Sequence, residues 1–166
     1  MKKLARLTAL LLTGVMLLLL ASCGAAPLTP EQQAKQEIFN AINEVRKDKG
    51  MPSLREVPKL TQLEQEFIEN FRKAGTKGIP NSEARKLEEE LYNKQKEAGW
   101  QFTGGIAYSY FGSSAKLGNV YEGDTEAFRK MLSIFSVEDA STALSIGVVT
   151  IEGKIYWTAT TLKPIT

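Results

Sequence analysis

The spacing of apolar residues predicts three amphipathic helices followed by a pair of strands. The first helix begins at Thr29, whose side chain can cap free amide groups, with Pro30 at the first helical position and Gln32 completing a capping box. Pro52 disfavours helix in the residue before it, so this helix is expected to end near Lys49. Its apolar face consists of Ala34, Ile38, Ala41, Ile42 and Val45.

A second helix is predicted from about Lys59, followed by a loop over residues 75–80. It carries a wide apolar stripe made of Leu60, Leu63, Phe67, Ile68, Phe71 and Ala74. The charged residues expected outside this stripe are Glu64, Glu66, Glu69 and Arg72. The stripe therefore predicts a helix with one face on the core.

The third helix is predicted over residues 82–98 and includes an acidic run at 88–90. Consecutive residues on a helix point in different directions, so three neighbouring carboxylates cannot converge on one metal ion. A solvated face is the better interpretation of this run. The apolar face of the helix consists of Ala84, Leu87, Leu91 and Ala98.

The end of the chain predicts a β-hairpin. Residues 146–151 and 154–160 are rich in β-branched and aromatic types, and Glu152 and Gly153 between them form a two-residue turn. Since side chains alternate along a strand, Tyr156 and Trp157 are expected to face different layers of the core. Helices first and antiparallel strands last predict an α+β fold.

The first residues have the pattern of an export signal. An apolar run over residues 7–20 is too short to span a membrane and has the length of a signal-peptide core; its basic residues precede it at Lys2, Lys3 and Arg6. The sequence Leu-Ala-Ser before Cys23 resembles a bacterial lipobox, in which the cysteine sulfur receives a diacylglycerol and becomes the new N-terminus. The alternative is a plain secretion signal with an unmodified cysteine.

These features divide the chain into a signal peptide (1–22), a tether (23–29) and one domain (30–166). The expected location is the cell membrane, with the domain held outside the cytoplasm by lipid on Cys23. Loss of the three basic residues of the signal changes the formal net charge from +2 to −1. Without a basic surplus, nucleic acid is not an expected partner.

Composition removes most common catalytic chemistries. The 166 residues include no histidine and one cysteine, which excludes the Ser-His-Asp triad, the Cys-His pair, His-ligated metals and an internal disulfide. A metal would have to bind through carboxylates and carbonyls. No cofactor, metal or catalytic residue is therefore predicted.

The candidate binding residues lie in the middle of the chain. From residue 100 to 121 the sequence is rich in Gly, Ser, Tyr and Phe, with a short extended piece at 106–110. Tyr108, Tyr110 and Phe111 are candidates for a ligand or partner surface, because aromatic residues on loops give contact area at low entropic cost. Asp124 or Thr125 is expected to cap a short helix that follows.

Glu138 is a further candidate, beside Asp139. The two carboxylates can hold calcium together with carbonyl groups, or share acid–base work if their surroundings separate their pKa values. They lack the regular spacing of a calcium loop, which favours a helix cap or a solvated turn instead.

Two blocks of sequence resemble the bacterial branch of the CAP superfamily (cysteine-rich secretory proteins, antigen 5 and pathogenesis-related proteins). Residues 42–54 resemble that family's opening N-x-x-R-x-x-x-G-x-x-x-L helix, and residues 59–65 its L-x-x-x-A-Q segment. Residues 145–149 and 155–159 resemble its I-G-V-G and Y-W-T-Q strands. Between the blocks, residues 98–100 and 106–108 resemble its A-G-Y and E-N-I-A-Y-G stretch. The resemblance spans about residues 35–162 and implies an α-β-α sandwich.

The chain departs from the family at its cavity. Many members carry two histidines and two acidic residues there, whereas this chain has no histidine and has Gly104 and Gly105 where the pattern has Glu-Asn. Residues 136–139 stand near the family's proline-glycine-histidine-arginine turn. Metal binding and cavity chemistry therefore do not carry over to this chain.

The sequence favours a non-enzymatic, surface-anchored lipoprotein that binds a ligand or protein partner. The alternative is a carrier of a small hydrophobic molecule such as a lipid or sterol, since some family members bind such ligands. An enzyme using only carboxylates, with Glu138 and Asp139 as its pair, is a third hypothesis.

Overall fold

The computed structural model describes residues 27–104 and 140–166, and the structural account is confined to them. The predicted signal peptide, Cys23, the extended piece at 106–110 and the helix after Asp124 lie outside these residues. Within the described residues, no helix is long and apolar enough to cross a membrane.

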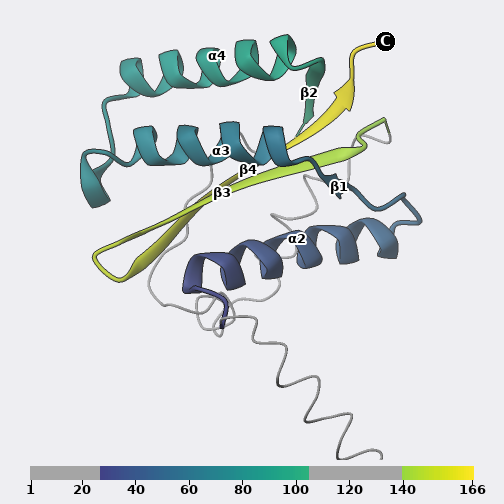
Figure 1. Cartoon of the computed structure of the whole chain (residues 1–166), viewed down its shortest axis with the longest axis horizontal. Coiled ribbons are helices and arrows are strands. Elements are labelled where there is room, and N and C mark those ends of the chain that lie inside the picture. The colour runs from purple at the N-terminus through teal and green to yellow at the C-terminus, as the bar shows by residue number, and fades with distance from the viewer. Residues whose placement is uncertain (1–26, 105–139) are drawn as a thin grey trace, which may run out of the picture.

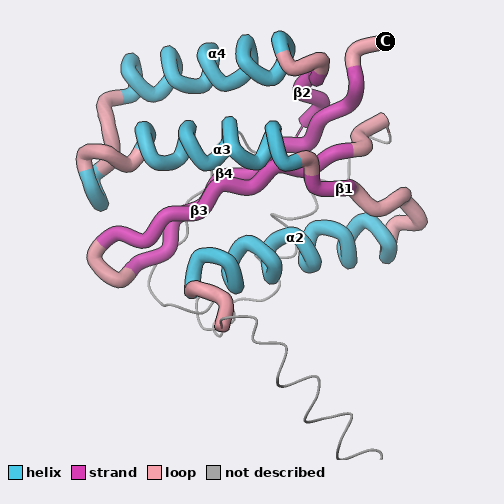
Figure 2. The backbone as a smooth tube through the Cα atoms, in the orientation of Figure 1, coloured by secondary structure: helices cyan, strands magenta, loops and turns pink. Residues whose placement is uncertain are grey.

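A four-stranded sheet lies between helices on both of its faces (Figures 1 and 2). The strand order is β1-β3-β4-β2, with α2 on one face and α3 on the other, and α4 packs beside α3. This arrangement confirms the α+β fold and its C-terminal hairpin. The elements are α2 (Pro30–Asp48), β1 (Arg55–Glu56), α3 (Pro58–Phe71), a 3-10 turn (Gly75–Lys77), α4 (Asn81–Glu97), β2 (Trp100–Gly104), β3 (Ala143–Ile151) and β4 (Lys154–Pro164).

The first turn of α2 has the predicted capping box. The backbone N–H of Gln32 donates to the Thr29 hydroxyl at 3.2 Å, and the Thr29 N–H donates to the Gln32 side-chain oxygen at 2.9 Å. These two bonds satisfy amide groups that have no partner inside a helix. The helix ends at Asp48, and Gly50 follows with a φ of 72°.

Two side chains from α2 hold the loop that leads into β1. The Asn43 amide donates to the Leu54 carbonyl at 3.1 Å and accepts from the Leu54 N–H at 2.7 Å. Arg46 is fully buried, and its Nε donates to the Pro52 carbonyl at 2.9 Å. Asn43, Arg46, Gly50 and Leu54 all belong to the block that resembles the CAP superfamily, and in this chain they fix a turn.

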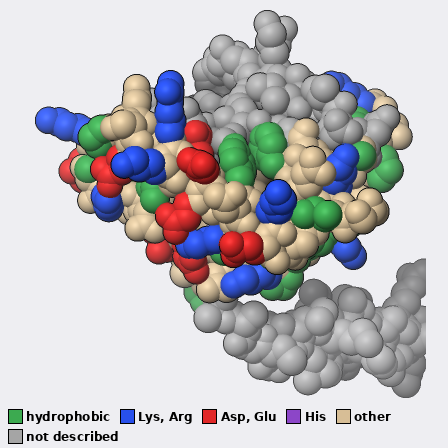
Figure 3. Space-filling model, turned by 90° about the horizontal axis from the view of Figure 1, so that it is seen from above, with side chains coloured by type: hydrophobic (Ala, Val, Ile, Leu, Met, Phe, Trp, Pro, Cys, Tyr) green, Lys and Arg blue, Asp and Glu red, His purple; other side chains and the backbone are tan. Residues whose placement is uncertain are grey.

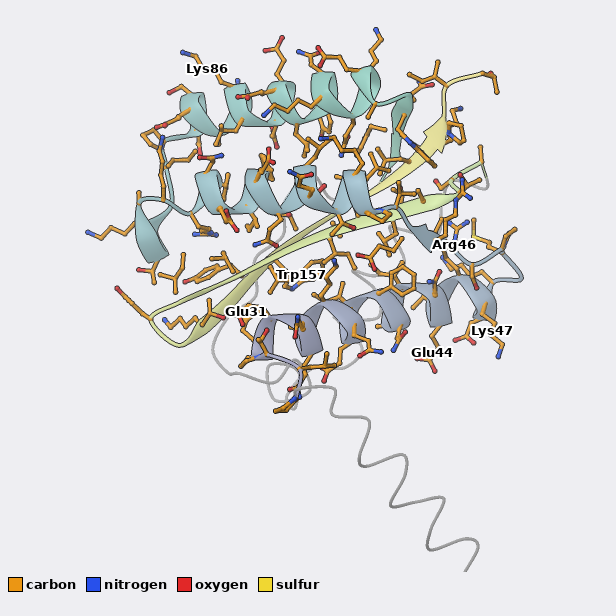
Figure 4. All side chains as sticks on the ribbon, in the orientation of Figure 1. Glu31, Glu44, Arg46, Lys47, Lys86 and Trp157 are labelled. Carbon is orange, nitrogen blue, oxygen red and sulfur yellow. The ribbon has the colours of Figure 1, made fainter. Side chains whose placement is uncertain are left out.

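The core has one half on each face of the sheet. Trp157, fully buried, points toward α2 and packs with Ile38 and Ile42 (Figure 4). Tyr156 packs on the other face with Phe67 and Leu91, from α3 and α4. The prediction that the two aromatic residues face different layers is confirmed.

The hairpin turn lies at the predicted residues. Ile151 pairs with Lys154, and the intervening Glu152 and Gly153 have φ angles of 51° and 74°. Both angles lie in the left-handed region, as a tight hairpin turn requires. The strands are longer than predicted, since β3 begins at Ala143 and β4 continues to Pro164.

Two expectations for α3 were wrong at its C-terminal end. Ala74 is exposed, because the helix stops at Phe71. Arg72 was expected outside the apolar stripe but is 5% exposed. Its guanidinium lies 4.2 Å from the centre of the Tyr156 ring and donates to the Thr76 carbonyl at 3.2 Å. Contact with an aromatic face and a carbonyl lets this charge lie inside.

Candidate functional site

Glu64 is a carboxyl group buried at the centre of the molecule. The sequence prediction placed it outside the apolar stripe of α3, which was wrong: the residue is 0% exposed. It lies four residues after Leu60 and four before Ile68, so it shares the face of α3 that lies on the sheet. That spacing was the signal in the sequence that could have located it.

The Glu64 carboxyl meets hydroxyl groups from the hairpin strands. Its Oε2 accepts from the Thr160 hydroxyl at 2.8 Å and from the Ser145 hydroxyl at 3.0 Å, and these two hydroxyls lie 2.7 Å apart. The Gln95 amide, from α4, donates to the Thr160 hydroxyl at 3.2 Å. All four side chains are fully buried.

The three oxygens of this cluster are arranged to share a proton from Glu64. Three contacts join Oε2 and the two hydroxyl oxygens, but Ser145 and Thr160 supply one hydrogen each. When Glu64 is protonated on Oε2, this oxygen donates to one of the two hydroxyls instead of accepting from it, and each contact then has its own hydrogen. Burial raises the pKa of Glu64 to about 7, against the opposing effect of the hydroxyls of Thr160, Thr158 and Ser145. Both observations favour the neutral acid below pH 7.

The backbone of α3 lies directly on the sheet beside this cluster. A Cβ atom built on Gly147 of β3 would lie 2.4 Å from the carbonyl oxygen of Glu64. No side chain fits there, so glycine at this position sets the distance between α3 and β3. The close approach holds Glu64 over the hydroxyls of the hairpin.

A separate surface hollow, here called the edge groove, runs between α2 and α3 along the outer side of β3. Its volume is about 800 Å³, and it is open to solvent. It is lined by Glu31, Gln32 and Lys35 of α2, Glu56 of β1, Pro58, Thr61, Gln62, Gln65 and Glu66 of α3, and Val148 of β3. Glu64 does not line it, so the buried acid and the edge groove are distinct features.

Polar contacts order the walls of the edge groove. Lys35 forms an ion pair with Glu56 at 2.5 Å, and the Thr61 hydroxyl donates to Glu56 at 2.9 Å. Burial raises the pKa of Glu56, but the hydrogen bond and charge of Lys35 and the hydrogen bond of Thr61 outweigh it, so the net pKa is lowered. On the α2 side, a hydrogen bond from Thr150 lowers the pKa of Glu31. These contacts restrict the conformations of Glu31, Lys35 and Glu56.

Gln65 connects α3 to the floor of the edge groove. Its amide nitrogen donates to the Val148 carbonyl at 2.8 Å, and its oxygen accepts from the Val148 N–H at 3.0 Å. Nothing in the sequence marked Gln65 or Val148 as site residues, because the open side of a strand is set by the order of strands in the sheet.

A smaller hollow, of about 430 Å³, lies at the far edge of the sheet. The rings of Tyr92 and Phe102 line it with centres 5.0 Å apart, together with Trp100 and the exposed Ile165. Charges of both signs are interspersed over the face that carries α4 (Figure 3). Residues on that face lie away from the edge groove, so they can serve as comparison positions in binding experiments.

The sequence-predicted site residues lie outside the described part of the chain. These are the lipidation candidate Cys23 and the binding candidates Tyr108, Tyr110, Phe111 and Glu138. Among the residues that are described, no group of three or more His, Cys, Asp or Glu side chains is placed to hold a metal ion.

The sequence matches no protein-family model and no curated protein. A function is therefore argued from the residues and geometry of the chain itself.

Proposed function

We propose that this chain is a non-enzymatic binding protein, tethered to the membrane through lipid on Cys23, that holds a segment of a protein partner in the edge groove. The observation that carries the proposal is the groove itself. Side chains from α2, β1 and α3 form its walls, with the Lys35–Glu56 ion pair already in place. Binding surfaces whose side chains are ordered in advance lose less conformational entropy when a partner arrives.

The tether and the sequence resemblance support the same proposal. The lipobox pattern ends at Cys23, only a few residues before α2 begins at Pro30, so the domain would stand close to the membrane. A CAP-like domain without the family's histidines suits a binding role better than a catalytic one. No histidine is present to act as a base or a ligand.

The open shape of the edge groove and the charged and amide groups around it favour a peptide over a lipid. Most of the surface exposed in the groove is apolar, but charged or amide residues supply most of its lining side chains, and the groove is open rather than enclosed. A hydrophobic ligand would leave these groups without hydrogen-bond partners or with poorer solvation. The carrier hypothesis thus has less support in the described residues than partner binding.

Site-specific photo-crosslinking in cells tests the proposal. A photo-reactive amino acid replaces Gln62, which is exposed in the wall of the edge groove, or Lys86, which lies on α4 away from it (Figure 4). We expect a discrete protein adduct from position 62 and none from position 86. The same adducts from both positions, or none from position 62, would refute binding in the groove.

A further inference from the structure

The two oxygens of the Glu64 carboxyl have different surroundings. Oε2 contacts the hydroxyls of Ser145 and Thr160, whereas Oε1 is buried and has no hydrogen-bond partner among the described residues. Ionisation spreads negative charge over both oxygens, and a buried charge without a hydrogen bond is far less stable than a neutral group. The contacts of Glu64 therefore suit the neutral acid and not the carboxylate.

The groups around Glu64 in the described part of the chain carry no compensating charge. They are Ser145 of β3, Thr158 and Thr160 of β4, and Gln95 of α4. Burial is the largest influence on the pKa of Glu64, and only hydroxyl groups oppose it. A carboxylate formed here gains solvation when α3 moves away from the sheet, so ionisation favours that movement.

Glu64 and the edge groove are linked by residues that are neighbours in α3 and in β3. The backbone of Gly147 lies against the Glu64 carbonyl. The next residue on each element, Val148 and Gln65, form the two hydrogen bonds of 2.8 and 3.0 Å at the floor of the groove. Half of the residues that line the groove belong to α3, which lies along the hairpin (Figure 1). Movement of α3 away from β3 therefore breaks the floor of the groove and displaces one of its walls.

We propose that Glu64 is a proton-dependent switch for the edge groove: the neutral acid keeps α3 on β3 and the groove able to hold a partner segment, and ionisation releases both. The inference rests on the proposed function and names the regulation of its site. A group that binds its proton more tightly in one arrangement of the chain than in another shifts the population between the two as pH changes.

The direction of the switch follows from the arrangement that holds the proton. With α3 on the sheet the pKa of Glu64 is about 7, and with α3 released the solvated carboxyl returns toward its ordinary 4.5. The arrangement with α3 on the sheet is therefore favoured at pH 5, loses this advantage as pH rises to 7, and changes little above 7. Between pH 5 and 7 the equilibrium shifts on the order of 30-fold toward release.

Amide hydrogen exchange on the full chain tests the switch without a partner. The Val148 N–H donates to the Gln65 side chain, so its protection factor (the exchange rate of the unfolded chain divided by the observed rate at the same pH) reports whether α3 is in place. The Leu54 N–H donates to the Asn43 side chain of α2, on the opposite face of the sheet, and is the control. We expect the Val148 protection factor to fall at least about tenfold from pH 5 to 7 and that of Leu54 to change by less than about threefold.

Two substitutions separate Glu64 from the other carboxylates of α3. Glu64→Gln supplies a neutral amide that donates and accepts as the protonated acid does, and it should hold the Val148 protection factor constant to within about twofold from pH 5 to 8. Glu66→Gln changes a groove residue whose side chain is 44% exposed, and it should keep the wild-type fall. If Glu64→Gln fails to fold, as circular dichroism would show, the comparison of Val148 with Leu54 in the wild-type chain decides the matter.

Photo-crosslinking at position 62 extends the test to partner binding. On cells held at pH 5.5 and 7.5, the adduct should decrease at least about fivefold at the higher pH, and it should not decrease when Glu64→Gln is also present. Equal falls in protection at Val148 and Leu54, no fall at Val148, or an adduct that does not change with pH would overturn the switch. No adduct at either pH refutes the proposed function instead, and the exchange measurements then decide on the movement of α3 alone.

Discussion

Glu64 has no cationic side chain within ion-pair distance among the described residues, so its burial is stabilised by protonation and hydroxyl contacts. Replacing an ionised carboxylate by its neutral acid avoids most of the cost of taking a charge out of water. The position is the one at which the L-x-x-x-A-Q pattern has alanine, so this chain puts an acid where that pattern has a small apolar residue. Ser145 on β3 and Thr160 on β4 provide the hydroxyl groups that contact this acid.

Glu64→Gln is expected to remove a pH dependence of stability. Because the pKa of Glu64 is raised from its ordinary 4.5 to about 7, the folded chain holds a proton that the unfolded chain loses between these values. The wild-type free energy of unfolding should therefore fall as pH rises from about 5 to 7, by about 2 kcal/mol, and then level off. Urea denaturation at pH 5, 6, 7 and 8 measures this slope.

Glu66→Gln is the matched control, since Glu66 is on the same helix with its side chain 44% exposed. It should keep the wild-type slope, whereas Glu64→Gln should flatten it. Glu31 and Glu56 have lowered pKa values, so their contributions are lost as pH falls below about 4.5, outside this window. A wild-type stability that does not change between pH 5 and 8 would contradict a neutral Glu64.

At the scale of elements, α2 positions the start of the sheet through a side chain rather than through packing alone. Asn43→Ala is expected to lower the free energy of unfolding by about 2 kcal/mol, because it leaves the N–H and C=O of Leu54 without their partner. Exchange of the Leu54 amide should accelerate as well. Urea denaturation and amide exchange measure the two effects.

Asn70→Ala serves as the comparison for Asn43→Ala. The Asn70 amide is exposed and donates to the Glu66 carbonyl within its own helix. Water can replace that bond, so the substitution should change stability by less than about 0.5 kcal/mol. Equal losses from the two substitutions would show that Asn43 does not fix the loop.

The sequence allowed the elements to be predicted where their signals are local. The capping box at Thr29, the apolar stripe of α3 and the turn at Glu152 and Gly153 each involve residues close in the chain. The burial of Glu64 is not indicated locally, because a charged residue predicts exposure unless its polar partners are known. Its hydroxyl partners on β3 and β4 lie more than 80 residues away.

The edge groove could not be predicted for a related reason. A groove beside β3 exists because β1 stops after two residues and because α2 and α3 lie on opposite faces of the sheet. Strand order and edge exposure follow from the whole topology. The residues around Gln65 in the sequence do not indicate whether its amide contacts water or the Val148 backbone.

At the scale of the whole molecule, the proposal requires that the domain be attached to the membrane. Cys23→Ser is expected to move the chain from the membrane fraction to the aqueous fraction, because it removes the sulfur that would carry the lipid. Ser22→Ala, which keeps a small residue beside the cysteine, should leave the chain with the membrane. Fractionation and intact-mass measurement test both; equal membrane retention of wild type and Cys23→Ser would refute lipid anchoring at Cys23.

The recess of the β3 edge has a consequence for crowding. Chains anchored to one bilayer diffuse in two dimensions, so they collide far more often than the same number of chains in solution. Exposed flat edges would then pair into growing sheets, which is how many fibrils begin. In this chain α2 and α3 flank the β3 edge, so the edges of neighbouring molecules cannot pair directly. If lipid on Cys23 anchors the chain, a dense layer of these molecules is therefore expected to remain unaggregated.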